Sequence, residues 1–316
     1  MSGQSAQPDG SSPPTRWGLV VRWALAAVVF GGCAYLLARQ GDDVATAVRR
    51  LSAGRVTLAG VLGVAATMCL ARVWLALLVG LGVEVGRRDA AAVFYLSQLG
   101  KYVPGSVWPV MAQVHLGARW GAPRRLMLGA GLLLLVVVTA SGISVAAVLL
   151  PWASPDGLRR YWWLLVVVVP LAALLHPRAL MAVLDRLSVW SGRQSLGARV
   201  SGRGVGLAWL WAMLGWVLLG AQLSVLLSAY GPLGATDVAA AVGGIGLAWA
   251  AGLAFVPAPA GVGVREGVLL LALGPTAGVD AALAVAVASR VLLVAADVAL
   301  AATSVGRHGL RDLRAS

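Results

Sequence analysis

Val256-Pro257-Ala258-Pro259-Ala260-Gly261-Val262-Gly263 interrupts one long apolar run, 238–274, and Lys101-Tyr102-Val103-Pro104-Gly105 interrupts another, 90–115. Proline removes a backbone donor and clashes with the preceding helical turn, and glycine adds conformational freedom, so neither run is predicted to be a continuous helix. Irregular backbone at membrane depth is stable only where protein or a wet cavity satisfies its polar groups. Both breaks are therefore predicted to face the interior of a membrane protein.

The composition around these breaks indicates that most of the chain lies in lipid. Of the 316 residues, 59% are hydrophobic and 12% are charged, whereas soluble domains are about 45–50% apolar. Apolar runs of about 20 residues, the length that crosses the hydrocarbon core as a helix, recur along the chain without the two-residue alternation of barrel strands. The predicted fold class is an all-α polytopic membrane protein.

Six full spans and the two broken, re-entrant segments give eight or so predicted membrane helices. The full spans are expected at 17–38, 56–82, 126–150, 161–176, 206–230 and 280–304. They form one transmembrane domain, 17–306, between a polar tail at 1–16 that is predicted to be disordered and a basic tail at 307–316. Apolar residues at helical spacing over 180–190 predict either an amphipathic surface helix or a plain connector.

The two halves of the domain have related sequences. Asp89-Ala90-Ala91-Ala92-Val93 precedes the first break and Asp237-Val238-Ala239-Ala240-Ala241-Val242 precedes the second, an offset of 148 residues (237 − 89). The prolines of the breaks, Pro104 and Pro257, differ by 153 (257 − 104). A similar offset, added to the residue numbers of the spans that flank the first break, gives approximately those of the spans that flank the second. An internal repeat is therefore predicted, with copies at 56–150 and 206–304.

The distribution of arginine predicts the orientation of these copies. With both breaks re-entrant, fifteen arginines fall on the side of the two termini, and six fall on the other side: Arg39, Arg49, Arg50, Arg55, Arg159 and Arg160. Cytoplasmic loops are rich in Arg and Lys, so both termini are predicted to lie in the cytoplasm, with the chain in the inner, cytoplasmic membrane. The breaks then enter from opposite sides, as in the inverted repeats of many transporters. This placement of the cations also argues against nucleic acid as a partner.

Charged residues inside the apolar runs are the candidates for a binding site, because a charge at the bilayer centre costs at least about 2.5–3.5 kcal/mol. The cations are Arg72, Lys101, Arg265 and Arg290, and their acidic neighbours in the sequence are Glu84, Glu266 beside Arg265, and Asp297 two helical turns from Arg290. Four cations against three acids favour an anion, and the free N–H groups of broken helix ends suit phosphate. Internal ion pairs that only lock helices together are the alternative.

Further residues are assigned by their position beside the breaks. Gln98, Gln113 and His115 flank the first break and can line the same path, although a lone histidine at a membrane boundary, such as His115, is more often an interfacial residue. Glu266 and Asp297 are candidates for coupling to an ion or a proton. The hinge positions are Pro104, Gly105, Pro257, Pro259, Gly261 and Gly263. Neither Cys33 nor Cys69 has the spacing of a metal ligand, so no metal or cofactor is predicted.

The motifs at the two breaks also resemble a known family. Gly100-Lys101-Tyr102-Val103-Pro104-Gly105 with Arg119, and Pro257 to Gly267, are similar to the transmembrane domain of lysylphosphatidylglycerol synthases and its stand-alone relatives, over residues 18–306. The resemblance implies a flippase that moves aminoacylated phosphatidylglycerol between leaflets. It also implies functional importance for Lys101, Pro104, Gly105, Gly261, Gly263 and Glu266. The soluble aminoacyl-transfer domain of the synthases has no counterpart here, so synthase activity is not implied.

The leading prediction is a lipid flippase or transporter for an anionic phospholipid or a polyprenyl-phosphate-linked lipid. No GxxxxGK[ST] nucleotide-binding loop is present, so ATP hydrolysis is not expected. One alternative is an accessory subunit that partners an envelope-biosynthesis enzyme. Another is a polyprenyl-phosphate-dependent glycosyltransferase, in which Asp42-Asp43 supplies an acidic base unless these residues start a helix. The sequence specifies no oligomeric state.

Overall fold

A computed structural model describes residues 49–102, 108–153, 156–174, 200–255 and 261–314, together with positions 178, 179, 182 and 186. Every regular element in these ranges is helical. The predicted tail at 1–16, the predicted span at 17–38, most of the predicted surface helix at 180–190, and four hinge positions lie outside the described residues. Those hinge positions are Pro104, Gly105, Pro257 and Pro259.

Five of the helices are long and apolar enough to cross a membrane. They are α2 (Ala53–Gly80), α5 (Arg124–Leu149, extended by a 3₁₀ turn to Trp152), α8 (Gly202–Leu227), α9 (Ala235–Ala254) and α11 (Val279–Arg314, apolar to Ser304). The predicted all-helical fold is confirmed. The chain is a membrane protein with several spans.

The spans differ in one respect from the predicted set. The expected span at 161–176 corresponds to α6 (Gly157–Leu174), which is not among those five helices. Instead α9, the first arm of the second broken segment, has 20 residues and is about 30 Å long, enough to cross the hydrocarbon core. Its glycines are tolerated because they allow close packing: a Cβ on Gly246 would lie 2.5 Å from the carbonyl oxygen of Gly142 in α5.

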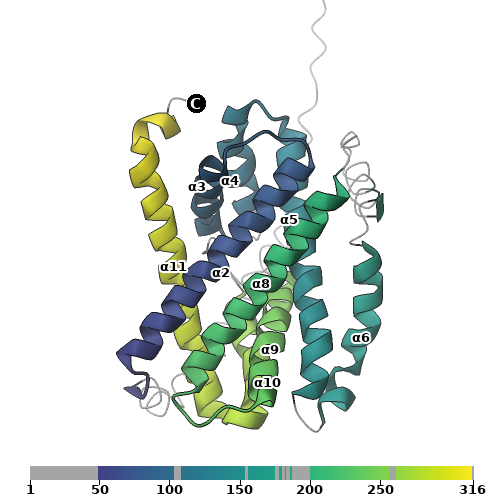
Figure 1. Cartoon of the computed structure of the whole chain (residues 1–316), viewed down its shortest axis with the longest axis vertical. Helices are drawn as coiled ribbons and strands as arrows, with labels where there is room; N and C mark the ends of the chain where they lie inside the picture. The colour runs from purple at the N-terminus through teal and green to yellow at the C-terminus, as the bar shows by residue number, and fades with distance from the viewer. Residues whose placement is uncertain are drawn as a thin grey trace, which may run out of the picture.

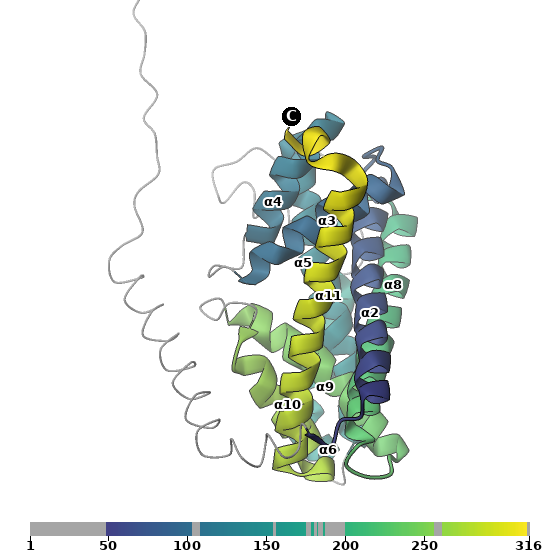
Figure 2. The same cartoon turned by 90° about the vertical axis from the view of Figure 1, so that its left-hand side faces the viewer.

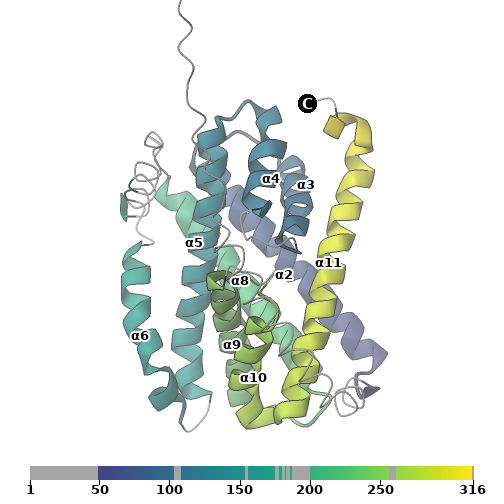
Figure 3. The ribbon, with the colours of Figure 1, turned by 180° about the vertical axis from the view of Figure 1, so that it is seen from behind.

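The two broken segments form helical hairpins at opposite ends of the molecule (Figure 1). The first consists of α3 (Arg87–Gln98), a 3₁₀ turn (Leu99–Tyr102) and α4 (Trp108–Gly117). The second consists of α9 and α10 (Val264–Ala277). Seen from behind, the tips of both hairpins point toward the middle of the molecule (Figure 3). At about 18 Å and 15 Å, α3 and α4 are each too short to span the hydrocarbon core.

Helix α11 runs the length of the molecule past both hairpins (Figure 2). It ends at the same end as α3 and α4, and the segment expected as a basic tail from residue 307 continues this helix to Arg314. Its neighbours include α10, α2, α3 and α8. A single helix therefore passes the tips of both breaks.

Contacts between helices follow a matched pattern. Helix α2 packs along α8, where a Cβ on Gly204 would lie 2.8 Å from the Cα of Gly80. Helix α3 packs on α11 as α9 packs on α5, and α4 packs on α5 as α10 packs on α11. These contacts of one half of the chain thus have counterparts in the other half, whereas the packing of α6 on α5 lies outside this pattern.

Candidate functional site

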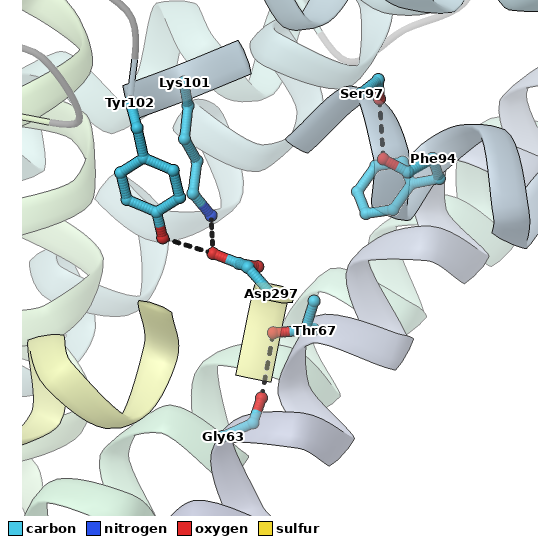
Figure 4. Close-up of polar contacts among 7 residues, drawn as sticks. All are labelled: Gly63, Thr67, Phe94, Ser97, Lys101, Tyr102 and Asp297. Carbon is cyan, nitrogen blue, oxygen red and sulfur yellow. Dashed lines mark hydrogen bonds and ion pairs between the residues drawn. The ribbon is translucent and has the colours of Figure 1, made fainter. Parts of the chain in front are cut away.

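Asp297 of α11 holds the tip of the first hairpin. Its carboxylate oxygen Oδ2 lies 2.6 Å from Lys101 Nζ and accepts a hydrogen bond of 2.6 Å from the Tyr102 hydroxyl. Lys101 and Tyr102 both point from the 3₁₀ turn toward this oxygen (Figure 4). Asp297 is 2% exposed. A carboxylate so deeply buried is stable because a cation and a hydroxyl donor both satisfy it.

Glu266 links the second break to α11 in the same way, except that here the hairpin supplies the acid and α11 supplies the cation. One of its oxygens accepts a hydrogen bond of 2.6 Å from the Gly263 backbone N–H, which caps the start of α10. Its other oxygen pairs with Arg290 of α11. Gly261 and Gly263 adopt left-handed backbone conformations, with φ of 68° and 83°. Glycine takes up that conformation without strain, so the chain can turn sharply into α10.

Arg265 lies at the centre of the site, against an aromatic ring. Its guanidinium carbon is 4.3 Å from the centre of the Trp249 ring, and Lys101 Nζ is 6.0 Å from the same ring. Both are within reach of a cation–π interaction. The terminal nitrogen Nη2 of Arg265 is buried and has no hydrogen-bond partner among the described residues. A buried donor of this kind favours a ligand that can accept its hydrogen bond.

Two cavities meet at these residues. The first has a volume of about 890 Å³, its open mouth included, and the charged residues in its wall are Lys101, Arg265, Glu266, Arg290 and Asp297. The second, of about 800 Å³, is lined by Gln98, Gln113, Lys101 and Arg265 among mainly apolar neighbours. Lys101, Trp249 and Arg265 belong to both walls.

The charges of the first cavity do not cancel. Its wall holds three cations and two carboxylates, a balance of +1 (3 − 2). Both carboxylates are already paired, Asp297 with Lys101 and Glu266 with Arg290. The remaining positive charge belongs to Arg265. Because fewer waters screen charges inside a protein than at its surface, this excess favours an anionic ligand.

The structure brings together five of the predicted charged residues, and its ion pairs do not join neighbours in the sequence. Neither Arg265 with Glu266 nor Arg290 with Asp297 forms an ion pair; the observed pairs are Lys101 with Asp297 and Arg290 with Glu266. Consecutive helical residues point in different directions. Residues seven apart are separated by about 10 Å along the axis, too far for direct contact.

Other predicted residues have different placements. Arg72 is absent from the walls of both cavities, and so is Glu84. Gly261 lines the second cavity, together with Gln98 and Gln113 as predicted, whereas His115 does not. Asp42 and Asp43 lie outside the described residues. No group of three or more His, Cys, Asp or Glu side chains that could hold a metal occurs within the described part of the chain.

No role was predicted from the sequence for Tyr102 or Trp249. A signal for Trp249 was present, because it follows Lys101 by 148 residues (249 − 101), the offset that relates Asp89 to Asp237. Aligning the two halves by their aspartates would have placed this tryptophan opposite the lysine. For Tyr102 the only signal was its position next to Lys101. The chain matches no protein-family model and no curated protein.

Proposed function

We propose that this protein moves an anionic lipid across the cytoplasmic membrane. The observation that carries this function is the net positive cavity at the tips of the two broken hairpins, with the buried Nη2 of Arg265 in its wall. A phosphate group supplies both the charge and the acceptors that this guanidinium lacks. Candidate ligand contacts are therefore Arg265, Lys101 and Arg290, and not Arg72.

The apolar remainder of the cavity wall favours a lipid over a small inorganic anion. Besides the charged residues, the wall contains three tryptophans and a set of aliphatic side chains from all five long helices, α2, α5, α8, α9 and α11. Acyl or polyprenyl chains find suitable partners there, while the phosphate lies at the cationic centre. The resemblance of both break motifs to the lysylphosphatidylglycerol synthase membrane domain also favours a lipid cargo.

The matched contacts between the halves support alternating access. Helices α2 to α5 and α8 to α11 have the same order and corresponding neighbours, and their hairpins enter from opposite ends. In an inverted repeat, exchange of conformations between the halves opens the central site first to one side and then to the other. Glu266 and Asp297 are the candidates for coupling this exchange to an ion or a proton, because each joins a hairpin tip to α11.

The arginines at the helix ends support an orientation with the α3–α4 end in the cytoplasm. Helix α3 begins with Arg87 and Arg88, and α5 begins with Arg124 and Arg125. Arg203 lies at the same end, at the start of α8, as do Arg307, Arg311 and Arg314 in the last turns of α11, which makes eight at these helix ends. In the described part of the chain the opposite end has five, namely Arg49, Arg50 and Arg55 at the start of α2 and Arg159 and Arg160 in the first turn of α6. The C-terminal end of α11 then also lies in the cytoplasm.

Transport is tested by reconstituting the protein in vesicles that contain acyl-labelled fluorescent phosphatidylglycerol and following the lipid accessible to dithionite. The wild-type protein is expected to expose inner-leaflet label far faster than protein-free vesicles. Arg265→Gln is expected to reduce the rate at least tenfold, because it removes the unpaired charge. Arg203→Gln is the matched control, since Arg203 is exposed at the start of α8 and its loss leaves the cavity unchanged.

The accessory-subunit alternative predicts a different result. Wild-type protein that is folded in vesicles but gives no acceleration with any anionic lipid, together with full tolerance of Arg265→Gln in cells, would support a structural partner role. Rates that fall equally with Arg265→Gln and Arg203→Gln would show that the cavity charge is not involved.

A further inference from the structure

Gln113 is a buried polar residue in the wall of the second cavity. It lies in α4, is 1% exposed, and its amide nitrogen Nε2 donates a hydrogen bond of 3.3 Å to the Ser97 hydroxyl of α3. Gln98, 6% exposed, lines the same cavity. Two buried amides thus lie beside two cations in this wall. The packing of α3 on α4 does not by itself need polar side chains here.

The hydrogen bonds of Ser97 determine which way the Gln113 amide points. The Ser97 hydroxyl donates its proton to the Phe94 carbonyl oxygen at 2.7 Å (Figure 4), so toward Gln113 it can only accept. The nitrogen of the amide therefore faces Ser97, and the oxygen Oε1 faces away. A Cβ built on Gly131, another wall residue, would lie 3.1 Å from this oxygen.

The oxygen Oε1 of Gln113 is buried and has no hydrogen-bond partner within the described ranges. The offset of 153 residues that relates Pro104 to Pro257 also relates Gln113 to Glu266 (266 − 113). Glu266 uses its two oxygens for Gly263 and Arg290. The corresponding acceptor of the first half is thus left for a ligand.

The surroundings of Oε1 define the kind of donor that fits. Lys101 and Arg265 line the same cavity, and its described wall contains no carboxylate. A cationic donor such as an ammonium group would be repelled by the charge of Arg265, which no carboxylate offsets, since Lys101 is paired with Asp297. A neutral hydroxyl donor is not repelled, and it can reach the amide while the phosphate that carries it contacts Arg265.

We propose that the second cavity is a headgroup subsite in which Gln113 accepts a hydrogen bond from a hydroxyl group of a phosphodiester lipid. This assignment rests on the proposed lipid transport and makes it more specific. The cargo class is a lipid with one phosphodiester and an uncharged, hydroxylated headgroup. Gln98 lines the subsite beside Gln113, and Arg265 joins it to the first cavity.

The test compares two acyl-labelled lipids of equal charge, phosphatidylglycerol and phosphatidylpropanol, which has a three-carbon headgroup without hydroxyls. In the vesicle assay the wild-type protein is expected to move phosphatidylglycerol about tenfold faster, because the hydroxyl-free lipid leaves a buried acceptor unsatisfied. Gln113→Leu is expected to bring the ratio close to one by slowing phosphatidylglycerol alone. Equal rates for both lipids in the wild-type protein would overturn the subsite, as would an equal loss for both in Gln113→Leu.

Gln222→Leu is the matched control. Gln222 is also a buried glutamine, but Ala59 and Ser289 satisfy its amide at 3.1 and 2.9 Å, and it lines neither cavity. Its loss is expected to change both rates by the same factor and to leave the wild-type ratio intact. A lipid preference that collapsed equally in Gln222→Leu would show that Gln113 acts through packing and would overturn the subsite.

A binding measurement separates the subsite from transport itself. Purified wild-type protein is incubated with an equimolar mixture of the two lipids, and the retained lipid is measured by native mass spectrometry. If the wild-type protein retains phosphatidylglycerol but moves neither lipid, and Gln113→Leu does not retain it, the subsite is supported and the proposed transport is overturned. Equal retention of the two lipids by the wild-type protein, with or without transport, would overturn the subsite.

Discussion

The two hairpin tips are attached to the same helix with opposite polarity. At the first tip the hairpin supplies the cation, Lys101, and α11 supplies the acid, Asp297. At the second tip the hairpin supplies the acid, Glu266, and α11 supplies the cation, Arg290. Because α11 presents one acid to the first tip and one cation to the second, each tip meets a complementary charge only in its own position. If the two tips exchanged partners on α11, like charges would face each other. Arg265 belongs to neither pair.

The tips also differ in how firmly they are held. Asp297 is nearly inaccessible and receives two hydrogen-bonding partners on one oxygen. The carboxylate of the second pair is more exposed, with Glu266 at 14% against 2% for Asp297, whereas the cations Arg290 and Lys101 are similar, at 24% and 22%. Burial raises the consequence of losing one partner, because the remaining charge has less access to water. The first tip is therefore expected to tolerate substitution less well than the second.

The largest effect is expected for Asp297→Ala. It leaves Lys101, whose side chain is 22% exposed, as a partly buried cation without a carboxylate and removes the acceptor of Tyr102, so the free energy of unfolding should fall by about 3 kcal/mol. Denaturation of the detergent-solubilised protein measures this loss. The double variant Lys101→Met with Asp297→Asn removes both charges and keeps an acceptor for Tyr102, so it should recover most of the stability. Wild-type stability of Asp297→Ala would contradict the importance of this pair.

A smaller effect is expected for Glu266→Gln. The glutamine oxygen can still cap α10 at the Gly263 N–H, but the charge opposite Arg290 is lost, so the free energy of unfolding should fall by about 2 kcal/mol. Glu266→Ala removes the cap as well and should cost more in the same denaturation measurement. If Glu266→Gln proved more damaging than Asp297→Ala, the order of the two tips would be reversed.

The free-energy cost of placing a charge in lipid explains why much of the site could be predicted. A charge inside an apolar run is expensive, so Lys101, Arg265, Glu266, Arg290 and Asp297 stood out as residues that must meet in the interior. Their pairing depends on how far each hairpin reaches along α11. That distance is set by packing between segments separated by up to 196 residues, as for Lys101 and Asp297 (297 − 101). Local spacing contains no information on this distance, and neither observed pair joins neighbours in the sequence.

The fold shows the same division between local and long-range information. Hydropathy over a window of residues identified α2, α5, α8 and α11, because lipid imposes length and composition on each span separately. It did not distinguish the arms of the second hairpin from short re-entrant helices. The length of α9 depends on its glycines packing against α5, where Gly246 meets the Gly142 backbone. Arg72 was a candidate for a related reason and lines neither cavity, since hydropathy locates a charge in a helix but not the direction of its side chain.

The smallest effect that distinguishes the two halves concerns the starts of their first helices. Ser201 Oγ accepts a hydrogen bond of 3.1 Å from Gly204 N at the start of α8, and Ser52 Oγ accepts one of 3.4 Å from Arg55 N at the start of α2. The shorter bond is the stronger, so Ser201→Ala should lower the free energy of unfolding by about 1 kcal/mol and Ser52→Ala by less. Ser201→Asn retains a capping oxygen and should stay close to wild type in the same denaturation assay. A larger loss at Ser52 than at Ser201 would show that the geometry of the cap does not determine its strength in this protein.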